Sequence, residues 1–121
     1  MRRLDGFTLI EMLMICLIIG ILVAVLTPNL LGARVAANDA VALNCVHALT
    51  QAAQAAKIDD GLSAPYREAA ALAQSPLGRP CSDERLTLAT QSVSNTEFSY
   101  TVRMRGGRLF TVTPTSVNRS N

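Results

Sequence analysis

A long and nearly all-apolar run near the N-terminus constrains this chain of 121 residues more than any other feature. From Phe7 to Leu31 the only charged side chain is Glu11. At ~1.5 Å per residue, a helix over this run is about 37 Å long, which is enough to cross the hydrocarbon core of a membrane. Arg2 and Arg3 precede it, so the positive-inside rule predicts a cytoplasmic start and an exported remainder.

Two ordinary explanations of the run fit poorly. A cleaved secretory signal peptide also has a basic start and an apolar stretch, but this stretch is long and no small-x-small cleavage site follows it. A plain membrane anchor leaves Glu11 unexplained, because a carboxylate in the apolar zone costs about 2.5–3.5 kcal/mol on insertion scales. A carboxylate in such a place usually marks a function or a partner.

The residues around Glu11 carry a specific motif. Residues 6–11 read Gly-Phe-Thr-Leu-Ile-Glu, with a glycine before a phenylalanine and a glutamate four residues later, at the start of an apolar helix. This resembles the processing motif of type IV prepilins and of the related type II secretion pseudopilins. The resemblance is close over about residues 6–45 and covers the remainder only in layout.

The resemblance implies a sequence of processing steps and a set of partners. A prepilin peptidase would cut between Gly6 and Phe7, and the new amine of Phe7 would be N-methylated. An inner-membrane assembly platform would then polymerise copies of the chain into a filament. The precursor would lie in a bacterial inner membrane, and the assembled pilus would lie outside the cell, on its surface.

Glu11 has an assembly role by the same resemblance, in which it neutralises the Phe7 amine of a neighbouring subunit. In a continuous helix Phe7 and Glu11 are one turn apart on the same side. An unpaired carboxylate and an unpaired amine are each costly in an apolar bundle. Pairing them across subunits therefore fixes the stagger between neighbours.

Gly20 and Pro28 are predicted to make the apolar helix yield. Pro28 has no N–H, so the Ala24 carbonyl loses its helical partner, and Gly20 adds backbone freedom. Transmembrane helices tolerate both residues. We expect a kink in the membrane and, by resemblance to pilins, partial melting of residues 20–28 in a filament.

Beyond Pro28 the helix is predicted to continue as an amphipathic segment to about Ile58 and to end at Asp59-Asp60-Gly61. Small or apolar residues recur there at helical spacing and are expected to face a sheet: Ala36, Ala40, Leu43, Val46 or His47, Thr50 and Ala53. The predicted organisation is a leader over 1–6, a membrane and polymerisation helix over 7–31, its amphipathic half over 32–58, a connection with a short helix over 59–84, and a sheet and tail over 85–121.

Cys45 and Cys81 lie in the half of the chain predicted to be exported, where they can form a disulfide. Closing that loop would remove roughly 4 kcal/mol of unfolded-chain entropy in the loop-closure model. The alternative is two free, buried thiols in a cytosolic domain. Cys16 lies within the apolar run.

Three β segments are predicted, at about Arg85–Val93, Glu97–Met104 and Arg108–Thr113, with a hairpin at Gly106-Gly107. A two-residue turn would pair apolar side chains with polar ones. A three-residue loop pairs Val102 with Phe110 and Tyr100 with Val112. Because register follows face consistency, we favour the longer loop. Its apolar face would contain Phe98, Tyr100, Val102, Met104, Phe110 and Val112.

In this hairpin Gly107 is expected to adopt a left-handed conformation. Pro114 is expected to stop the sheet, and residues 115–121 to form a polar tail. The predicted fold is thus α+β and pilin-like: a long N-terminal helix, transmembrane and then amphipathic, packed against a small antiparallel sheet of about three strands.

The function that this organisation predicts is a structural subunit of a type IV pilus. A minor pilin or a type II secretion pseudopilin is the alternative, and a DNA-uptake pilus subunit with a basic surface at Arg103, Arg105 and Arg108 is a further one. A net charge of +2 is too small by itself to argue for a nucleic-acid partner. The sequence contains no Ser/His/Asp set, no metal-ligand spacing and no glycine-rich phosphate loop, so we expect neither an enzyme nor a cofactor or metal.

Overall fold

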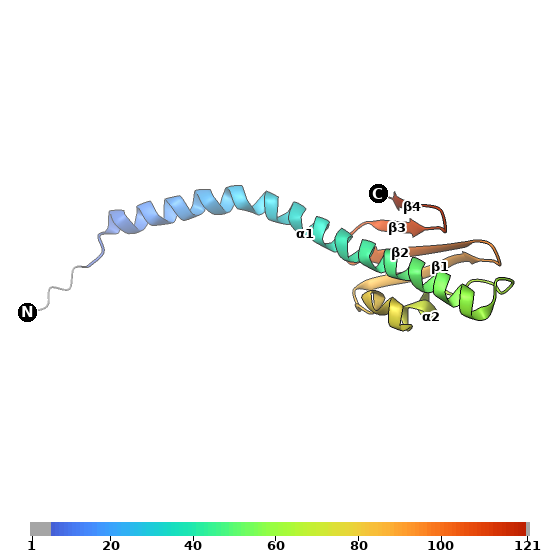
Figure 1. Cartoon of the computed structure of the whole chain (residues 1–121). Helices are drawn as coiled ribbons and strands as arrows, with labels where there is room; N and C mark the ends of the chain where they lie inside the picture. The colour runs from blue at the N-terminus through green and yellow to red at the C-terminus, as the bar shows by residue number, and fades with distance from the viewer. Residues whose placement is uncertain (1–5, 121) are drawn as a thin grey trace, which may run out of the picture. The chain divides into compact units, whose positions relative to one another are not determined.

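The computed structural model describes residues 6–120, so residues 1–5 of the predicted leader lie outside the described part. The elements, in chain order, are α1 (Leu9–Asp60), α2 (Ala69–Ala73), the 3-10 helix η1 (Pro76–Cys81), β1 (Leu86–Val93), β2 (Phe98–Met104), β3 (Leu109–Val112) and β4 (Val117–Ser120) (Figure 1). The chain divides into two compact units between Arg34 and Val35.

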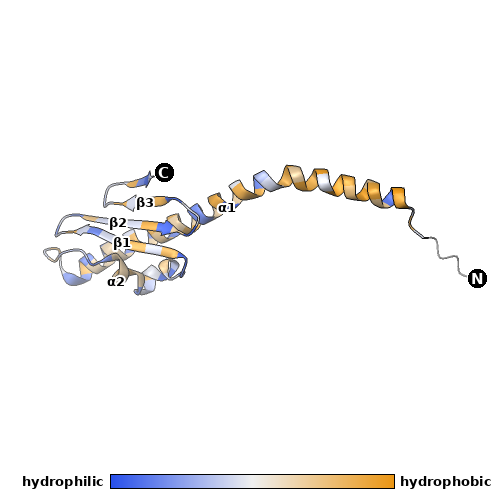
Figure 2. Cartoon of the chain, turned by 180° about the vertical axis from the view of Figure 1, so that it is seen from behind, coloured by the Kyte–Doolittle hydropathy of each residue, from blue (hydrophilic) through white to orange (hydrophobic). Residues whose placement is uncertain are grey.

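The first unit is the N-terminal part of α1. Its most apolar 18-residue stretch has a mean hydropathy of 3.0 and contains no buried residue, so the helix is long and apolar enough to cross a membrane. Figure 2 shows apolar residues on all sides of this part of the helix. A helix that is apolar all round requires an apolar environment.

The second unit packs the rest of α1 on one face of an antiparallel sheet with strand order β1-β2-β3-β4 (Figure 1). All six residues of the predicted apolar face are buried. Val102 pairs with Phe110 and Tyr100 with Val112, which confirms the register of the three-residue loop. The predicted α+β fold class is therefore confirmed.

The hairpin differs from prediction in which glycine is left-handed. Gly106 has a φ of 78°, in the left-handed region, whereas the φ of Gly107 is not positive. The Gly107 N–H donates to the Met104 carbonyl at 2.8 Å. This closes a four-residue turn with Gly106 at its third position, where a type II turn needs a positive φ.

The predicted polar tail is wrong, because residues 117–120 form β4 and pair with β3 from Leu109 to Val112. Thr113 makes the connection: its N–H donates to the Ser116 carbonyl at 2.8 Å, and its hydroxyl accepts the Ser116 N–H at 3.1 Å. All four residues of β4 are exposed. A strand exposed on both faces shows no apolar alternation, so hydrophobic periodicity could not predict it.

The face of α1 that meets the sheet is also shifted from the prediction. Ala36, Ala40 and Leu43 are exposed, although Val46 and Ala53 are buried as expected. The buried face is Ala42, Cys45, Val46, Ala48, Leu49, Ala52, Ala53 and Lys57. Alanines lie on all sides of this segment, so spacing alone could not select one face.

A disulfide and a buried lysine hold the connection between α1 and the sheet in place. Cys45 on α1 and Cys81 at the end of η1 form a disulfide, with Cα atoms 4.7 Å apart. Lys57, 8% exposed, donates from Nζ to the carbonyls of Ala64 and, at 2.6 Å, Asn95. Its Nζ also lies 4.9 Å from the centre of the Tyr66 ring. One buried ammonium thus joins the last turns of α1, the connection and the β1–β2 turn.

Tyr100 is fully buried at the centre of the sheet. Its ring stacks on Phe98 with centres 4.6 Å apart, and its hydroxyl donates to the Arg67 carbonyl at 2.5 Å. Burial, with a smaller contribution from Tyr66, raises the pKa of Tyr100 to about 12. The phenol therefore stays protonated where a free tyrosine would ionise.

Removal of the disulfide should destabilise the second unit. Cys45→Ala/Cys81→Ala should lower the free energy of unfolding by about 4 kcal/mol, because a long loop is no longer closed in the unfolded chain. Urea unfolding of the full chain in detergent, followed by circular dichroism, measures this. Cys16→Ser is the control, since Cys16 is a free and exposed thiol, and it should leave the transition unchanged.

Alkaline pH should destabilise the fold through Tyr100. Between pH 10 and 12 the unfolded chain loses the Tyr100 proton while the folded chain retains it, so the free energy of unfolding falls as pH rises. Tyr100→Phe should be less stable at pH 7, since the Arg67 carbonyl loses its donor, but should show a flatter decline above pH 10. An equally steep decline in both proteins would contradict this assignment.

Candidate functional site

The described chain begins with three residues outside any helix or strand, Gly6, Phe7 and Thr8, all exposed. Thr8 starts the helix. Its hydroxyl accepts the Glu11 N–H at 3.3 Å, and its carbonyl accepts the N–H groups of Glu11 and Met12 at 3.1 and 3.3 Å. The Gly6–Phe7 peptide bond therefore lies on exposed, non-helical chain, which is the kind of backbone a peptidase can reach.

A continuous helix from Phe7 is predicted to place Phe7 and Glu11 on one face. In the structure α1 begins at Leu9, so Phe7 lies before the helix and that premise does not hold for the uncleaved chain. Glu11 lies in the first turn of α1 and is exposed. The positive end of the helix dipole favours a carboxylate there.

Sequence reasoning missed the role of Thr8 as the residue that caps α1. The signal was present, because Thr-x-x-Glu before an apolar run is the pattern of a capping box. The structure contains half of that box, the Thr8 hydroxyl accepting the Glu11 N–H. The Glu11 carboxylate makes no salt bridge with any residue between 6 and 120, so it is available to a partner.

Gly20 and Pro28 leave α1 unbroken in the single chain. The Thr27 hydroxyl, next to Pro28, donates to the Val23 carbonyl at 2.7 Å. A side chain that bonds the carbonyl four residues back accompanies bends in helices. The carbonyl of Ala24, the residue after Val23, receives no backbone hydrogen bond from Pro28, because proline has no N–H. Whether residues 20–28 melt stays a prediction about the filament.

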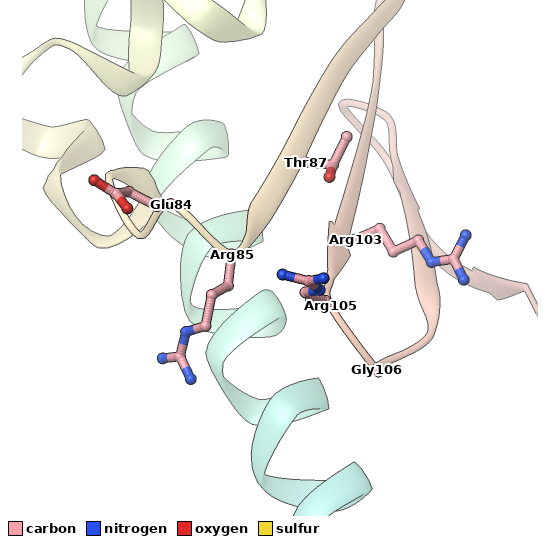
Figure 3. A pocket seen from close by; sticks show the side chains of 6 residues that line it. All are labelled: Glu84, Arg85, Thr87, Arg103, Arg105 and Gly106. Atoms are coloured by element: carbon pink, nitrogen blue, oxygen red, sulfur yellow. The ribbon is translucent and has the colours of Figure 1, made fainter.

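The three arginines of the candidate basic patch lie around the β2–β3 hairpin. The Arg108 N–H donates to Asp39 Oδ1 at 2.9 Å, and its guanidinium lies 3.9 Å from Asp39 Oδ2. Arg103 and Arg105 form no salt bridge within the described residues. They line an open cavity of about 470 Å³ with Arg85, Thr87, Glu84 and Gly106 (Figure 3).

The N-terminal segment matches a known family model. Residues 1–27 match the prokaryotic N-terminal methylation motif. The match covers Gly6, Phe7 and Glu11 and reaches into the apolar part of α1.

Known proteins resemble the chain over two different extents. The type IV wide pilus major component PilA4 of Thermus thermophilus is 36% identical over 115 residues, which are 94% of this chain and 85% of the relative. The type II secretion system core protein G of Aeromonas hydrophila is 37% identical over 49% of this chain, and that of Vibrio cholerae is 37% identical over 51%. The matches span 41% and 42% of those two relatives.

Proposed function

This chain belongs to the type IV pilin-like family, and from that premise we propose that it is a structural subunit of a type IV pilus. The observation that carries the proposal is the exposed apolar surface of α1 around one carboxylate, Glu11. Water cannot cover a surface of this size without a large cost. Lipid covers it in the precursor, and other copies of α1 cover it in the filament.

A pilus is favoured over a type II secretion pseudopilus by the extent of the matches. The relative named as a major component of a wide pilus matches almost the whole chain. The match therefore includes the second unit, which begins at Val35 and is here called the head. The two secretion proteins match about half of it. The N-terminal methylation motif over residues 1–27 is typical of both kinds of filament by resemblance, so the distinction rests on the remainder of the chain. A minor pilin or a pseudopilin is the alternative role.

The proposed partners follow from the N-terminal segment. A prepilin peptidase cuts the exposed bond between Gly6 and Phe7 and the new amine of Phe7 is methylated. An inner-membrane assembly platform then moves the chain from the membrane into a filament of identical subunits at the cell surface. Glu11 neutralises the Phe7 amine of a neighbouring subunit, where an unpaired charge would be costly.

Sheared surface fibres from the source cell test the assignment. Mass spectrometry should find a chain that begins at methylated Phe7, as the main component of the fibre if this is a major pilin. Trace amounts would indicate a minor pilin or a pseudopilin. A chain cut after the apolar run, as a signal peptide is, would contradict the proposal.

Glu11→Ala should leave membrane insertion intact, or improve it, because a carboxylate is removed from the apolar zone. Filament yield should fall at least about tenfold, because the neighbouring amine loses a charge partner that is worth more than about 1.4 kcal/mol in an apolar bundle. The measurement compares chain in the sheared fibre fraction with cleaved chain in the membrane.

Glu11→Gln is the matched variant, with nearly the same shape and no charge, and it should fail in the same way. Met14→Leu is the control, a swap of similar volume on the exposed apolar surface, and it should assemble normally. Normal filaments from Glu11→Ala would refute the pairing.

A further inference from the structure

The second unit carries opposite charges at the two ends of its sheet. The strand register fixes these ends. One end holds the β2–β3 hairpin together with the start of β1 and the end of β4, since Arg103 pairs with Thr87 and with Leu109, and Leu109 pairs with Ser120. The other end holds the β1–β2 and β3–β4 turns. At about 3.3 Å per residue, the seven residues of β2 separate the ends by roughly 20 Å.

The first end, here called the basic end, carries Arg85, Arg103, Arg105, Arg108 and Arg119. Two of these five arginines form salt bridges within the chain. The Arg85 guanidinium donates to both carboxylate oxygens of Asp83 and holds the pKa of Asp83 to about 2. Arg108 is held by Asp39.

Three arginines therefore remain at the basic end without a salt bridge inside residues 6–120, namely Arg103, Arg105 and Arg119. All three are exposed. Arg103 and Arg105 line the cavity of Figure 3, and the one acidic residue that lines it with them is Glu84.

The opposite end, here called the acidic end, carries Asp59 and Asp60 at the end of α1 and Glu97 in the β1–β2 turn. Lys57 brings these together, because it lies in the last turn of α1 and its Nζ donates to the Asn95 carbonyl at 2.6 Å. Asp60 is bound by Arg67 at 2.5 Å. Asp59 and Glu97 are exposed and form no salt bridge in the described chain.

The basic end does not have the form of a site for a small anion. Figure 3 shows the guanidinium groups of Arg85 and Arg103 on opposite sides of Arg105, directed away from each other rather than toward a common centre. Recognition of a single phosphate or carboxylate by arginines needs converging donors. Splayed arginines suit several separate carboxylates, and at its other end this chain carries two, Asp59 and Glu97, that form no salt bridge in the described chain.

We propose that the basic end of one subunit docks on the acidic end of a second copy, with Arg103 and Arg105 facing Asp59 and Glu97. The proposal rests on the filament proposed above and specifies the contact between its heads. The two surfaces differ and lie at opposite ends of one body, so the contact is head-to-tail and can propagate from subunit to subunit. Complementary charge also selects this orientation, because the reversed one would bring like charges together.

Charge reversal in the full chain, expressed with its assembly machinery, tests the contact. The basic-end variant is Arg103→Glu/Arg105→Glu, the acidic-end variant is Asp59→Lys/Glu97→Lys, and the third variant combines all four substitutions. Asp60 and Arg67 are left unchanged so that their ion pair still supports the fold. The measurement is chain in the sheared fibre fraction relative to cleaved chain in the membrane, with Cys45–Cys81 oxidation as the check on folding.

Each reversal alone should lower the filament yield on the order of tenfold, because like charges then face each other. The combined variant restores opposite charges and should return the yield to within about threefold of the unaltered chain. A matched pair of milder variants controls for net charge: Arg103→Gln/Arg105→Gln should assemble less well, and Ala89→Glu/Gln91→Glu, which alters net charge equally at exposed mid-strand positions, should not.

Two results would overturn the contact alone. One is normal, Glu11-dependent assembly of the basic-end variant. If those filaments assemble normally but no longer bind duplex DNA, the basic end would be assigned to nucleic-acid binding instead. The other is a combined variant that is cleaved and oxidised but assembles no better than either reversal. Absence of filaments from the unaltered chain would instead overturn the proposed function, and this contact with it.

Discussion

The apolar surface of the first turns of α1 is the constraint on which the rest of the protein depends. From Leu9 to Leu31 no side chain is buried within the chain itself, so this surface must be covered by something else. Membrane lipid and a bundle of identical helices both satisfy that requirement. A chain that moves between these two environments needs a feature that tells them apart. We propose Glu11 as that feature, because a lone carboxylate is costly in lipid and can be neutralised by a neighbour's amine in the bundle.

The head solves a different problem, which is to fold on a small core. The helix α1 is exposed in the first unit of the chain but contributes to the core of the second unit, where Val46 and Leu49 pack under the sheet. A small domain buries a modest fraction of its surface, and here ties that are not apolar add to the packing. The Cys45–Cys81 disulfide and the buried Lys57 ammonium fix the connection, and Asp39 fixes the hairpin.

These ties also position the charges of the head. Asp39 holds the arginine-bearing hairpin near the start of the second unit, and Lys57 holds the β1–β2 turn near the end of α1. The charged residues at the two ends are therefore held in place relative to α1. In the proposed filament, Glu11 sets the stagger between neighbouring helices, and the proposed contact between the ends of the heads reinforces it.

The N-terminal motif and the apolar run determined the class of protein from the sequence alone, because a glycine, a phenylalanine and a glutamate at this spacing before a membrane-length helix closely resemble the prepilin processing motif. The hairpin register was also readable, since only one loop length places Val102 and Phe110 on the same face. Tertiary structure decided the rest. Packing against the sheet determined which face of α1 is buried, because alanines lie on all its sides. Backbone pairing with β3 formed β4, whose side chains show no pattern, and the hairpin turn required the positive φ at Gly106. Tertiary structure also brought Asp59 and Glu97 to one end of the sheet and Arg103 and Arg105 to the other, a separation of charge that depends on strand pairing and not on position in the chain.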